Sequence, residues 1–369
     1  MKEIDLAYRT MFAELDQRTF DAAFTSEFSP DGIFVKQKAK NLEFWYFQTE
    51  VDGKPFRKYV GPCSDEEINS RVAKFNELKN DLKSRRKLVS TLVRNAYLPS
   101  PERFTGDVVE ALSNVGLFRL RAVLVGTVAY QCYSGLLGVR LPSTAMQTGD
   151  ADFAQFHSIS AAGEDSLPPI LEVLKKVDPT FRDIPRQSDG RSSTQFENGK
   201  KFKVEFLTPN TGSDEYSGRA TQMPALGGAA AHPLRFLDFL IRDPVRTVML
   251  HKSGVPVVVP APERYGVHKL IVSSQRRNDA SSYTKGEKDT AQAVSLFEAL
   301  VQTRRHGDLG MVFAEAWNRG PSWREGITAG LSYVDDNKRS LMEDGLRQGL
   351  IEIGESPEDF GLTGGLPKP

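Results

Sequence analysis

A glycine-threonine pair that follows a short apolar run has the residue types of a phosphate-binding turn. Arg121 to Val125 predicts a strand, and Gly126 and Thr127 then lead into a helix within the segment LVGTVAYQCYSGLLG. Free backbone N–H groups at a helix N-terminus bind anions, and glycine lets a phosphate approach the backbone. Thr127 can cap the helix or donate its hydroxyl to that phosphate. On its own, such a pair is usually only a turn.

Two aspartates follow in the segment TGDADF. Asp150 and Asp152 stand two residues apart on a predicted strand, so their side chains share one face. Two carboxylates roughly 4 Å from a common point repel by about 4 kcal/mol at an effective dielectric near 20. A divalent cation between them removes this cost, and Mg²⁺ or Mn²⁺ is expected because both accept oxygen ligands. A lone Asp-x-Asp is more often a loop or a cap, but its order after the glycine-threonine pair favours a catalytic site.

A third acid lies in the segment TQFENGKKFKVEFLTP. Asn198-Gly199 between two alternating runs predicts a β-hairpin. In its second strand Glu205 shares a face with lysines, so it is either a solvated strand residue or a third carboxylate beside Asp150 and Asp152. Three converging carboxylates can hold two metals that clamp the attacking and leaving oxygens of a phosphoryl displacement.

The order of these motifs resembles the DNA polymerase β-like nucleotidyltransferase superfamily. More narrowly, VPVVVPAPERYGVHKLIVSSQRR and KGEKDTAQAVSLFEAL look like a bacterial family of stand-alone nucleotidyltransferase-fold proteins, and the resemblance covers residues 105 to 305. It implies that Gly126 and Thr127 correspond to the Gly-Ser signature, and that the catalytic, metal-binding acids are Asp150, Asp152 and Glu205.

This chain departs from the superfamily pattern in three ways. Threonine replaces serine at position 127, and glutamate replaces the commoner aspartate at position 205. Both changes are chemically mild. The interval between the glycine and the first aspartate is longer than is typical, which leaves the loop from Val139 to Gly149 without a role.

Two downstream helices carry further candidates for nucleotide binding. A helix predicted from Pro262 to about residue 275 leaves Lys269 and Arg276 away from its apolar face, where they can meet triphosphate oxygens or form a solvated basic face. Lys288 and Asp289 begin the next predicted helix, and the resemblance implies that a Lys and an Asp from this part complete the site.

Composition is that of a soluble enzyme. The chain has 369 residues and a formal net charge of zero, so no global field draws it to nucleic acid or membrane. Its 2 cysteines are too few for a disulfide framework or a zinc site. The N-terminus lacks an apolar signal core, and no run of about 18 apolar residues occurs. These features predict a cytoplasmic protein with no membrane contact.

Residues 1–100 lie outside the resemblance and predict a hairpin and a long helix. Two alternating runs about Asp52-Gly53 give a β-hairpin with aromatic rings beside cations. Such rings can stack nucleic-acid bases, or they can simply pack on the neighbouring helix. A capping box at Ser64 to Glu67 starts a helix that runs to about Ala96, and its seven-residue apolar repeat can dimerise or pack within its own domain. Its cluster Lys83 to Lys87 is a positive patch for a polyanion or a solvated face.

We therefore predict an α/β (α+β) fold with a polymerase β-like core and a mixed sheet. The predicted units are the N-terminal arm 1–100, the nucleotidyltransferase core 101–260, a helical C-terminal part 261–350 and a flexible tail 351–369. The expected reaction moves NMP from an NTP substrate to an acceptor hydroxyl. The acceptor is expected to be RNA such as tRNA, with a role as a toxin or defence enzyme. The alternatives are a small-molecule acceptor such as an aminoglycoside-like drug, a protein acceptor, or a silent nucleic-acid-binding module.

Overall fold

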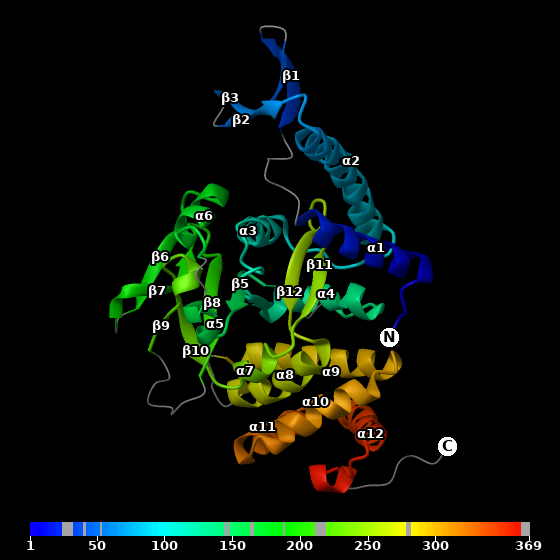
Figure 1. Cartoon of the computed structure of the whole chain (residues 1–369). Helices are drawn as coiled ribbons and strands as arrows, with labels where there is room; N and C mark the ends of the chain where they lie inside the picture. The colour runs from blue at the N-terminus through cyan, green and yellow to red at the C-terminus, as the bar shows by residue number, and fades with distance from the viewer. Residues whose placement is uncertain are drawn as a thin grey trace.

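A central mixed sheet, a body of C-terminal helices and a projecting N-terminal part make up the molecule (Figure 1). The computed structural model describes the chain except at residues 24–31, 40–41, 52–53, 144–145, 147, 163–165, 187–188, 211–218, 278–281 and 363–369. Within the part described, every helix is too short or too polar to span a lipid bilayer.

The helices and strands follow one another along the chain in the order of their labels within each class. The helices are α1 (Leu6–Ala23), α2 (Glu66–Arg94), α3 (Arg103–Asn114), α4 (Gly126–Leu137), α5 (His157–Ala162), α6 (Ile170–Val177), α7 (Leu237–Leu240), α8 (Pro262–Arg277), α9 (Tyr283–Gln302), α10 (His306–Asn318), α11 (Pro321–Ser332) and α12 (Asp336–Glu352), with 3-10 turns η3 (Pro224–Leu226) and η4 (Pro357–Phe360). The strands are β1 (Ile33–Ala39), β2 (Leu42–Val51), β3 (Lys54–Pro62), β4 (Val123–Val125), β5 (Asp150–Ala154), β6 (Arg182–Arg186), β7 (Asp189–Glu197), β8 (Lys203–Pro209), β9 (Thr221–Gln222), β10 (Ala230–Leu234), β11 (Val245–Met249) and β12 (Val255–Val259).

The central sheet has the strand order β4-β5-β8-β10-β9, with β7 pairing β8 and β6 pairing β7. Strands β5 and β8 run parallel, whereas β4 pairs antiparallel with β5. Hairpin β7–β8 turns through Asn198 and Gly199, as the alternating runs predict. The mixed sheet among many helices confirms the expected fold class. Ala151, Phe153, Val204 and Phe206 are buried in its core, which leaves the intervening acidic positions of β5 and β8 on the opposite face.

The N-terminal part carries a three-stranded antiparallel sheet at the far end of α2 (Figure 1). The expected hairpin is β2–β3, β1 adds a third strand, and the turn at residues 52–53 lies outside the described residues. Phe34, Phe47 and Phe75 pack ring against ring, and Trp45 Nε1 donates to Asn69 Oδ1 of α2 at 2.8 Å. Phe47 and Trp45 of the hairpin therefore pack on the neighbouring helix, as one of the two interpretations of this sequence predicts.

The second half of α2 packs on the core through α1, which the sequence patterns did not indicate. Leu15 of α1, Val89 and Leu92 of α2, and Val248 belong to one buried cluster. The second half of the apolar repeat of α2 is thus covered within one chain, and the homodimer through this helix stays a prediction that this packing does not support. The end of α4 and the first residues of the following loop also bind the N-terminal segment. The Ile4 N–H donates to the Gly138 carbonyl at 2.9 Å, and the Arg140 N–H donates to the Lys2 carbonyl at 2.9 Å.

Arg85 departs from the expected positive patch, because only 4% of its surface is exposed. Its Nε donates to Asp81 Oδ2 at 2.6 Å, and its Nη1 lies 3.3 Å from Thr19 Oγ1 and 3.1 Å from the Ser253 carbonyl. Asp81 also pairs with Arg18 at 2.7 Å. Arg85 therefore joins α1, α2 and the β11–β12 turn, and it is not available to a polyanion.

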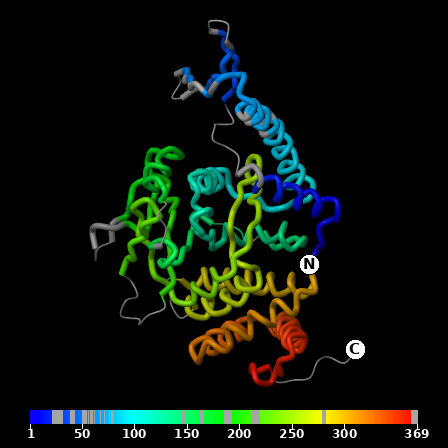
Figure 2. Tube along the Cα trace, in the orientation of Figure 1, coloured from blue at the N-terminus to red at the C-terminus, as the bar shows by residue number. Residues whose placement is uncertain are grey.

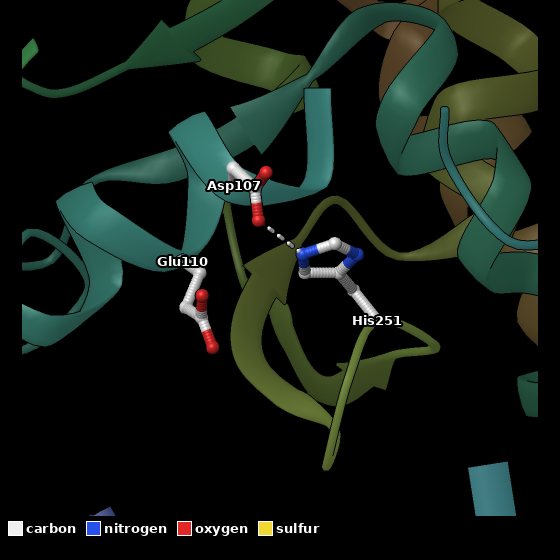
Figure 3. A group of neighbouring side chains, drawn as sticks. All are labelled: Asp107, Glu110 and His251. Atoms are coloured by element: carbon white, nitrogen blue, oxygen red, sulfur yellow. Dashed lines mark hydrogen bonds and ion pairs between the residues drawn. The ribbon is translucent and has the colours of Figure 1, made fainter. Parts of the chain in front are cut away.

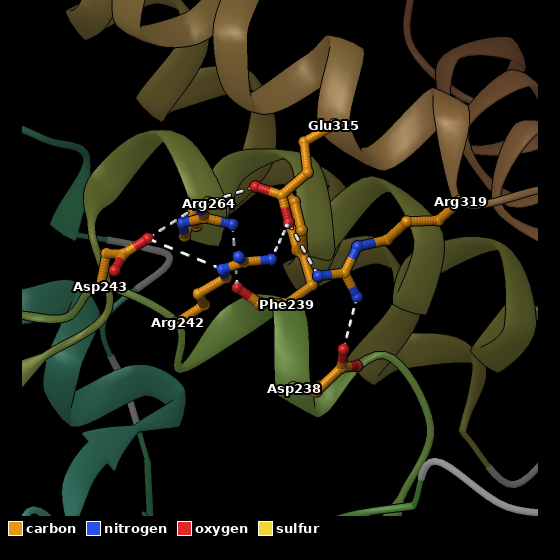
Figure 4. Close-up of polar contacts among 7 residues, drawn as sticks. All are labelled: Asp238, Phe239, Arg242, Asp243, Arg264, Glu315 and Arg319. Carbon is orange, nitrogen blue, oxygen red and sulfur yellow. Dashed lines mark hydrogen bonds and ion pairs between the residues drawn. The ribbon is translucent and has the colours of Figure 1, made fainter.

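The C-terminal helices are joined by an ion-pair network around Arg264 and Glu315 (Figure 4). Arg264 Nη2 lies 2.8 Å from Glu315 Oε2, and Arg319 bridges Glu315 and Asp238 at 2.7 and 2.5 Å. The network ties α7, α8 and the end of α10 together. The Gln302 Nε2 donates to the Met1 carbonyl at 3.1 Å, so the chain start lies beside the end of α9 (Figure 2).

The segment expected as a flexible tail is ordered at its start. Helix α12 continues to Glu352, η4 follows, and Phe360 and Leu362 are 4% and 5% exposed in the core. Two large apolar side chains that dock on the core outweigh the turn-forming residues around them. Residues 363–369 lie outside the described residues.

Candidate active site

Strand β4 ends in a sharp turn at Gly126, which begins α4. The φ of Gly126 is +67°, a left-handed conformation in which a side chain is strained. A Cβ built there would also lie 2.6 Å from Asp152 Oδ2. A side chain at position 126 would therefore collide with the Asp152 carboxylate, and it would also occupy room that a bound phosphate needs. The N-cap position of α4 is Val125, so Thr127 lies inside the first turn and does not have the capping role that its type allows.

The register of the central strands brings the predicted acids together. Asp152 pairs with Val125 of β4 on one side and with Glu205 of β8 on the other. Asp150 lies two residues before Asp152 on the same strand face, and all three acids keep partial exposure. The three carboxylates therefore lie next to one another and next to the glycine turn.

Two neighbours that the sequence analysis did not name orient these carboxylates. The Thr148 hydroxyl donates to Asp150 Oδ1, and Gln195 Nε2 donates to Glu205 Oε1 at 2.7 Å. Gln195 lies directly opposite Glu205 in the β7–β8 hairpin. Counting residues outward from the Asn198-Gly199 turn would have found that contact.

The Asp152 carboxyl group is buried beside two other carboxyl groups, which disfavours its negative charge. Burial of its carboxyl group, then repulsion from Asp150 and Glu205, raises the pKa of Asp152 from 3.8 to about 8, while Lys269 and Arg276 act in the opposite direction. At neutral pH, without a cation, the Asp152 carboxyl group is thus mostly protonated. A divalent cation would compensate this charge and displace the proton.

The predicted cations on α8 lie against the predicted acid on α9. Lys269 Nζ lies 2.5 Å from Asp289 Oδ1, and Arg276 Nη1 lies 2.5 Å from Asp289 Oδ2. Asp289 is 2% exposed; burial alone would raise its pKa, but Lys269 and Arg276 outweigh burial and lower it. Asp289 thus holds the two cations in place. Arg276 keeps 40% of its side chain exposed, whereas Lys269 keeps 10%.

Lys288 also belongs to this site. Burial, then repulsion from Lys269, lowers its pKa, and Asp150 opposes the shift. Lys288 is therefore within electrostatic reach of Asp150. It lies in the second turn of α9, which begins earlier, at Tyr283, than the sequence indicated.

Tyr265 links the glycine turn to the helices that carry these cations. Its ring is fully buried, and its hydroxyl donates to the Gly126 carbonyl at 2.9 Å and lies 3.0 Å from Gln292 Oε1. In a trans peptide the carbonyl and the next N–H point in opposite directions. By holding the Gly126 carbonyl, Tyr265 therefore also sets the direction of the Thr127 N–H. No sequence pattern indicated this contact, because its partners are 139 residues apart.

A second group of ligand-type side chains lies between α3 and the turn after β11. Asp107, Glu110 and His251 place one ligand atom each within 4.8 Å of one another (Figure 3). Among the described residues Asp150, Asp152 and Glu205 do not meet this spacing. The Lys252 ammonium already lies 2.7 Å from Asp107 Oδ1 and 2.5 Å from Glu110 Oε2. Lys252 thus supplies the charge that a metal ion would, and the group clasps α3 to the hairpin.

Comparisons with known proteins identify the family. A family model described as "Nucleotidyltransferase" matches residues 103–318, which is more than half of the chain. The chain belongs to this nucleotidyltransferase family. The matched segment contains every predicted site residue and ends with α10, so the N-terminal arm, α11 and α12 lie outside it.

Similarity beyond the family is low. No curated protein matches the nucleotidyltransferase significantly. A solved structure of an antigenic nucleotidyltransferase-like protein from Paracoccidioides brasiliensis matches with 14% identity and a TM-score of 0.30, over 62% of this chain and 94% of that one. A TM-score of this size does not establish a common fold. The family membership therefore rests on the sequence match, and it identifies the protein as an enzyme of nucleotidyl transfer.

Proposed function

We propose that this enzyme is a metal-dependent nucleotidyltransferase of the polymerase β-like type. It would move a nucleoside monophosphate from a nucleoside triphosphate to an acceptor hydroxyl. The observation that carries the proposal is the β5–β8 register, which places Asp152 beside Glu205 with Asp150 on the same strand face. Gly126 adjoins Asp152, which supports a phosphate site at this turn beside the acidic residues.

The donor set fits Mg²⁺ or Mn²⁺, because carboxylate oxygens are the ligands that these ions accept. Asp150, Asp152 and Glu205 would hold the metal. The raised pKa of Asp152 shows that negative charge is unfavourable there, and a bound metal ion would compensate that charge. When bound, the metal supplies positive charge to the attacking and leaving oxygens. Glu205 would have to turn from Gln195 to contribute its oxygens fully.

The residues of the chain would share the reaction as follows. The α4 N-terminus binds triphosphate oxygens through its backbone N–H groups. Arg276, Lys269 and Lys288 stabilise charge that develops on the pyrophosphate, and Asp289 positions the first two. The acceptor oxygen bonds to the α-phosphorus as the bond to the bridging oxygen breaks. Pyrophosphate leaves, and Glu205 takes the hydroxyl proton.

RNA, such as tRNA, is the acceptor that we propose, in a toxin or defence role. The three-stranded sheet lies at the far end of α2, whose 29 residues extend about 43 Å. A small molecule in the active site could not reach that sheet, whereas a polynucleotide could. The sheet also offers Tyr46 under the Arg57 guanidinium, with 4.6 Å between the Cζ atom and the ring centroid.

The proposal is tested by incubating the protein with each α-labelled triphosphate, Mg²⁺ or Mn²⁺, and separate pools of cellular RNA, protein and metabolites. We expect label in RNA, and none with Asp150→Asn. Label in the protein or the metabolite pool alone would replace RNA with that acceptor. Absence of label from all three pools, with every triphosphate and both metals, would contradict nucleotidyl transfer.

A further inference from the structure

The outer face of the second half of α2 carries a row of cations. Lys83, Arg86, Lys87 and Arg94 are all exposed, and none of them forms an ion pair within the described part of the chain. At 3.6 residues per turn their side chains fall within an arc of about 100° and extend over about 16 Å. We call these four residues the α2 basic stripe.

The opposite face of the same helix segment is the one that packs on the protein. Val89, Leu92 and Ala96 are buried against α1 and the β11–β12 hairpin, and Arg85 is buried beside them. Of the five cations in this helix segment, Arg85 therefore contacts the rest of the protein, and the four of the α2 basic stripe face solvent. Four like charges in a row repel one another, and no ion pair among the described residues offsets this repulsion.

An exposed aromatic ring continues the stripe. Tyr97 is 69% exposed, and its φ is +56°, in the left-handed region where glycine usually ends a helix. The Arg140 guanidinium covers one face of the Tyr97 ring, with 4.9 Å between Cζ and the ring centroid. The left-handed backbone strains a tyrosine at this position, and burial of its ring offsets little of that strain because most of the side chain is exposed.

The Tyr97 ring lies near the C-terminal end of α4, whose N-terminal end is at the proposed active site. Arg140 follows α4, which starts at Gly126 and extends about 18 Å over its 12 residues. A chain bound along the stripe would therefore arrive at one end of the helix whose other end is the phosphate-binding turn.

We propose that the α2 basic stripe, with Tyr97 at its end, binds a single-stranded segment of a polynucleotide acceptor. This inference rests on the proposed function, because it names where the acceptor lies. Phosphates in sequence would meet the four cations, and one unpaired base would stack on Tyr97. Cations in a row together with an exposed ring fit a single strand better than an acidic protein or a duplex, neither of which presents an unpaired base.

The test compares two matched double variants of the full-length protein. Arg86→Ala with Lys87→Ala removes two stripe charges, and Lys175→Ala with Lys176→Ala removes two exposed, adjacent helix charges on α6. The probe is a fluorescent 12-nucleotide oligouridylate, and binding is measured by anisotropy over a series of salt concentrations. Each single-strand phosphate contact contributes about 0.7 to the salt slope, so the stripe variant should flatten the slope by about 1.4. The α6 variant should leave the slope unchanged.

A third variant tests the base contact. Tyr97→Asn removes the ring, and asparagine tolerates the left-handed backbone, so the fold should be kept. We expect at least about a fivefold loss of affinity for the strand, with an unchanged salt slope. Thermal melting of each variant confirms that it is folded.

The outcomes separate this inference from the proposed function. Three results would overturn the stripe proposal, even where transfer to RNA occurs. These are equal salt slopes in the wild type and the stripe variant, equal losses of affinity in both double variants, and a 12-base-pair duplex that binds as tightly as the strand. Stripe-dependent binding of the strand without any transfer would support the stripe and contradict the proposed function. Wild-type protein that does not bind the strand would overturn the inference.

Discussion

Replacing Asp152 with asparagine should stabilise the metal-free protein. The pKa of Asp152 is raised from 3.8 to about 8, first by burial and then by the two neighbouring carboxylates. At pH 7 the unfolded chain therefore gains free energy by ionising this group, while the folded chain keeps it mostly protonated. The difference amounts to about 4 kcal/mol at most, since each pKa unit is worth about 1.4 kcal/mol. In a chain of this size each kcal/mol raises the melting temperature by about 2 °C.

The pH dependence has a definite sign. A carboxyl group whose folded pKa is raised contributes stability that is present below pH 3.8 and is lost as the pH rises to about 8. The advantage of Asp152→Asn over the wild type should thus grow between pH 4 and 8 and then level off. Saturating Mg²⁺ with nucleotide should reverse the order, because the variant lacks a ligand.

The assay is thermal and guanidinium unfolding in EDTA at several pH values. Asp183→Asn is the control, because it makes the same change at an exposed position on β6. Its melting temperature should match that of the wild type. An advantage of Asp152→Asn that shrinks as the pH rises, or no difference from the wild type at pH 8, would refute the electrostatic account of this site.

Three further substitutions test other parts of the site and fold. Gly126→Ala adds a Cβ 2.6 Å from a carboxylate oxygen at positive φ, so it should lower stability by about 1–2 kcal/mol and weaken nucleotide binding measured by calorimetry. Gly149→Ala adds a Cβ in open space and should change neither quantity. Tyr265→Phe should weaken nucleotide binding about threefold to tenfold, whereas Tyr133→Phe, which loses a comparable hydrogen bond to the Pro260 carbonyl, should lower stability only. Equal nucleotide affinities of the two variants would show that Tyr265 has a purely structural role. Arg85→Ala should lower the free energy of unfolding by about 2 kcal/mol in guanidinium titrations, and an unchanged value would contradict its clasping role.

The acidic site could be predicted from the sequence because short-range rules determine it. Alternation along a strand puts Asp150 and Asp152 on one face, and the Asn198-Gly199 turn fixes the strand that carries Glu205. Only the side-by-side placement of the two strands required the resemblance to a known fold.

Contacts between distant segments could not be predicted in this way. From the sequence, Tyr265 is an ordinary apolar position of a helix, and its neighbours in the sequence do not indicate that its hydroxyl donates a hydrogen bond to the Gly126 carbonyl. Arg85 sits within a charge run, and its burial follows from α1, which pairs with α2 only in the folded chain. Helical phase alone would have placed Arg85 with the apolar positions of α2, since it lies one turn before Val89. The charges from Lys83 to Lys87 are contiguous in the sequence, but the helix distributes them over two faces.

The central claim is that the α-phosphoryl group moves with its nucleoside and that pyrophosphate leaves. It is tested most directly by parallel reactions with α-labelled and γ-labelled triphosphate, with the acceptor product isolated from each. Nucleotidyl transfer predicts that the product carries the α label without the γ label, that pyrophosphate appears in equal amount, and that Asp150→Asn and Asp152→Asn abolish both. A product that carries the γ label, or one that forms equally well with either aspartate replaced, would contradict the account.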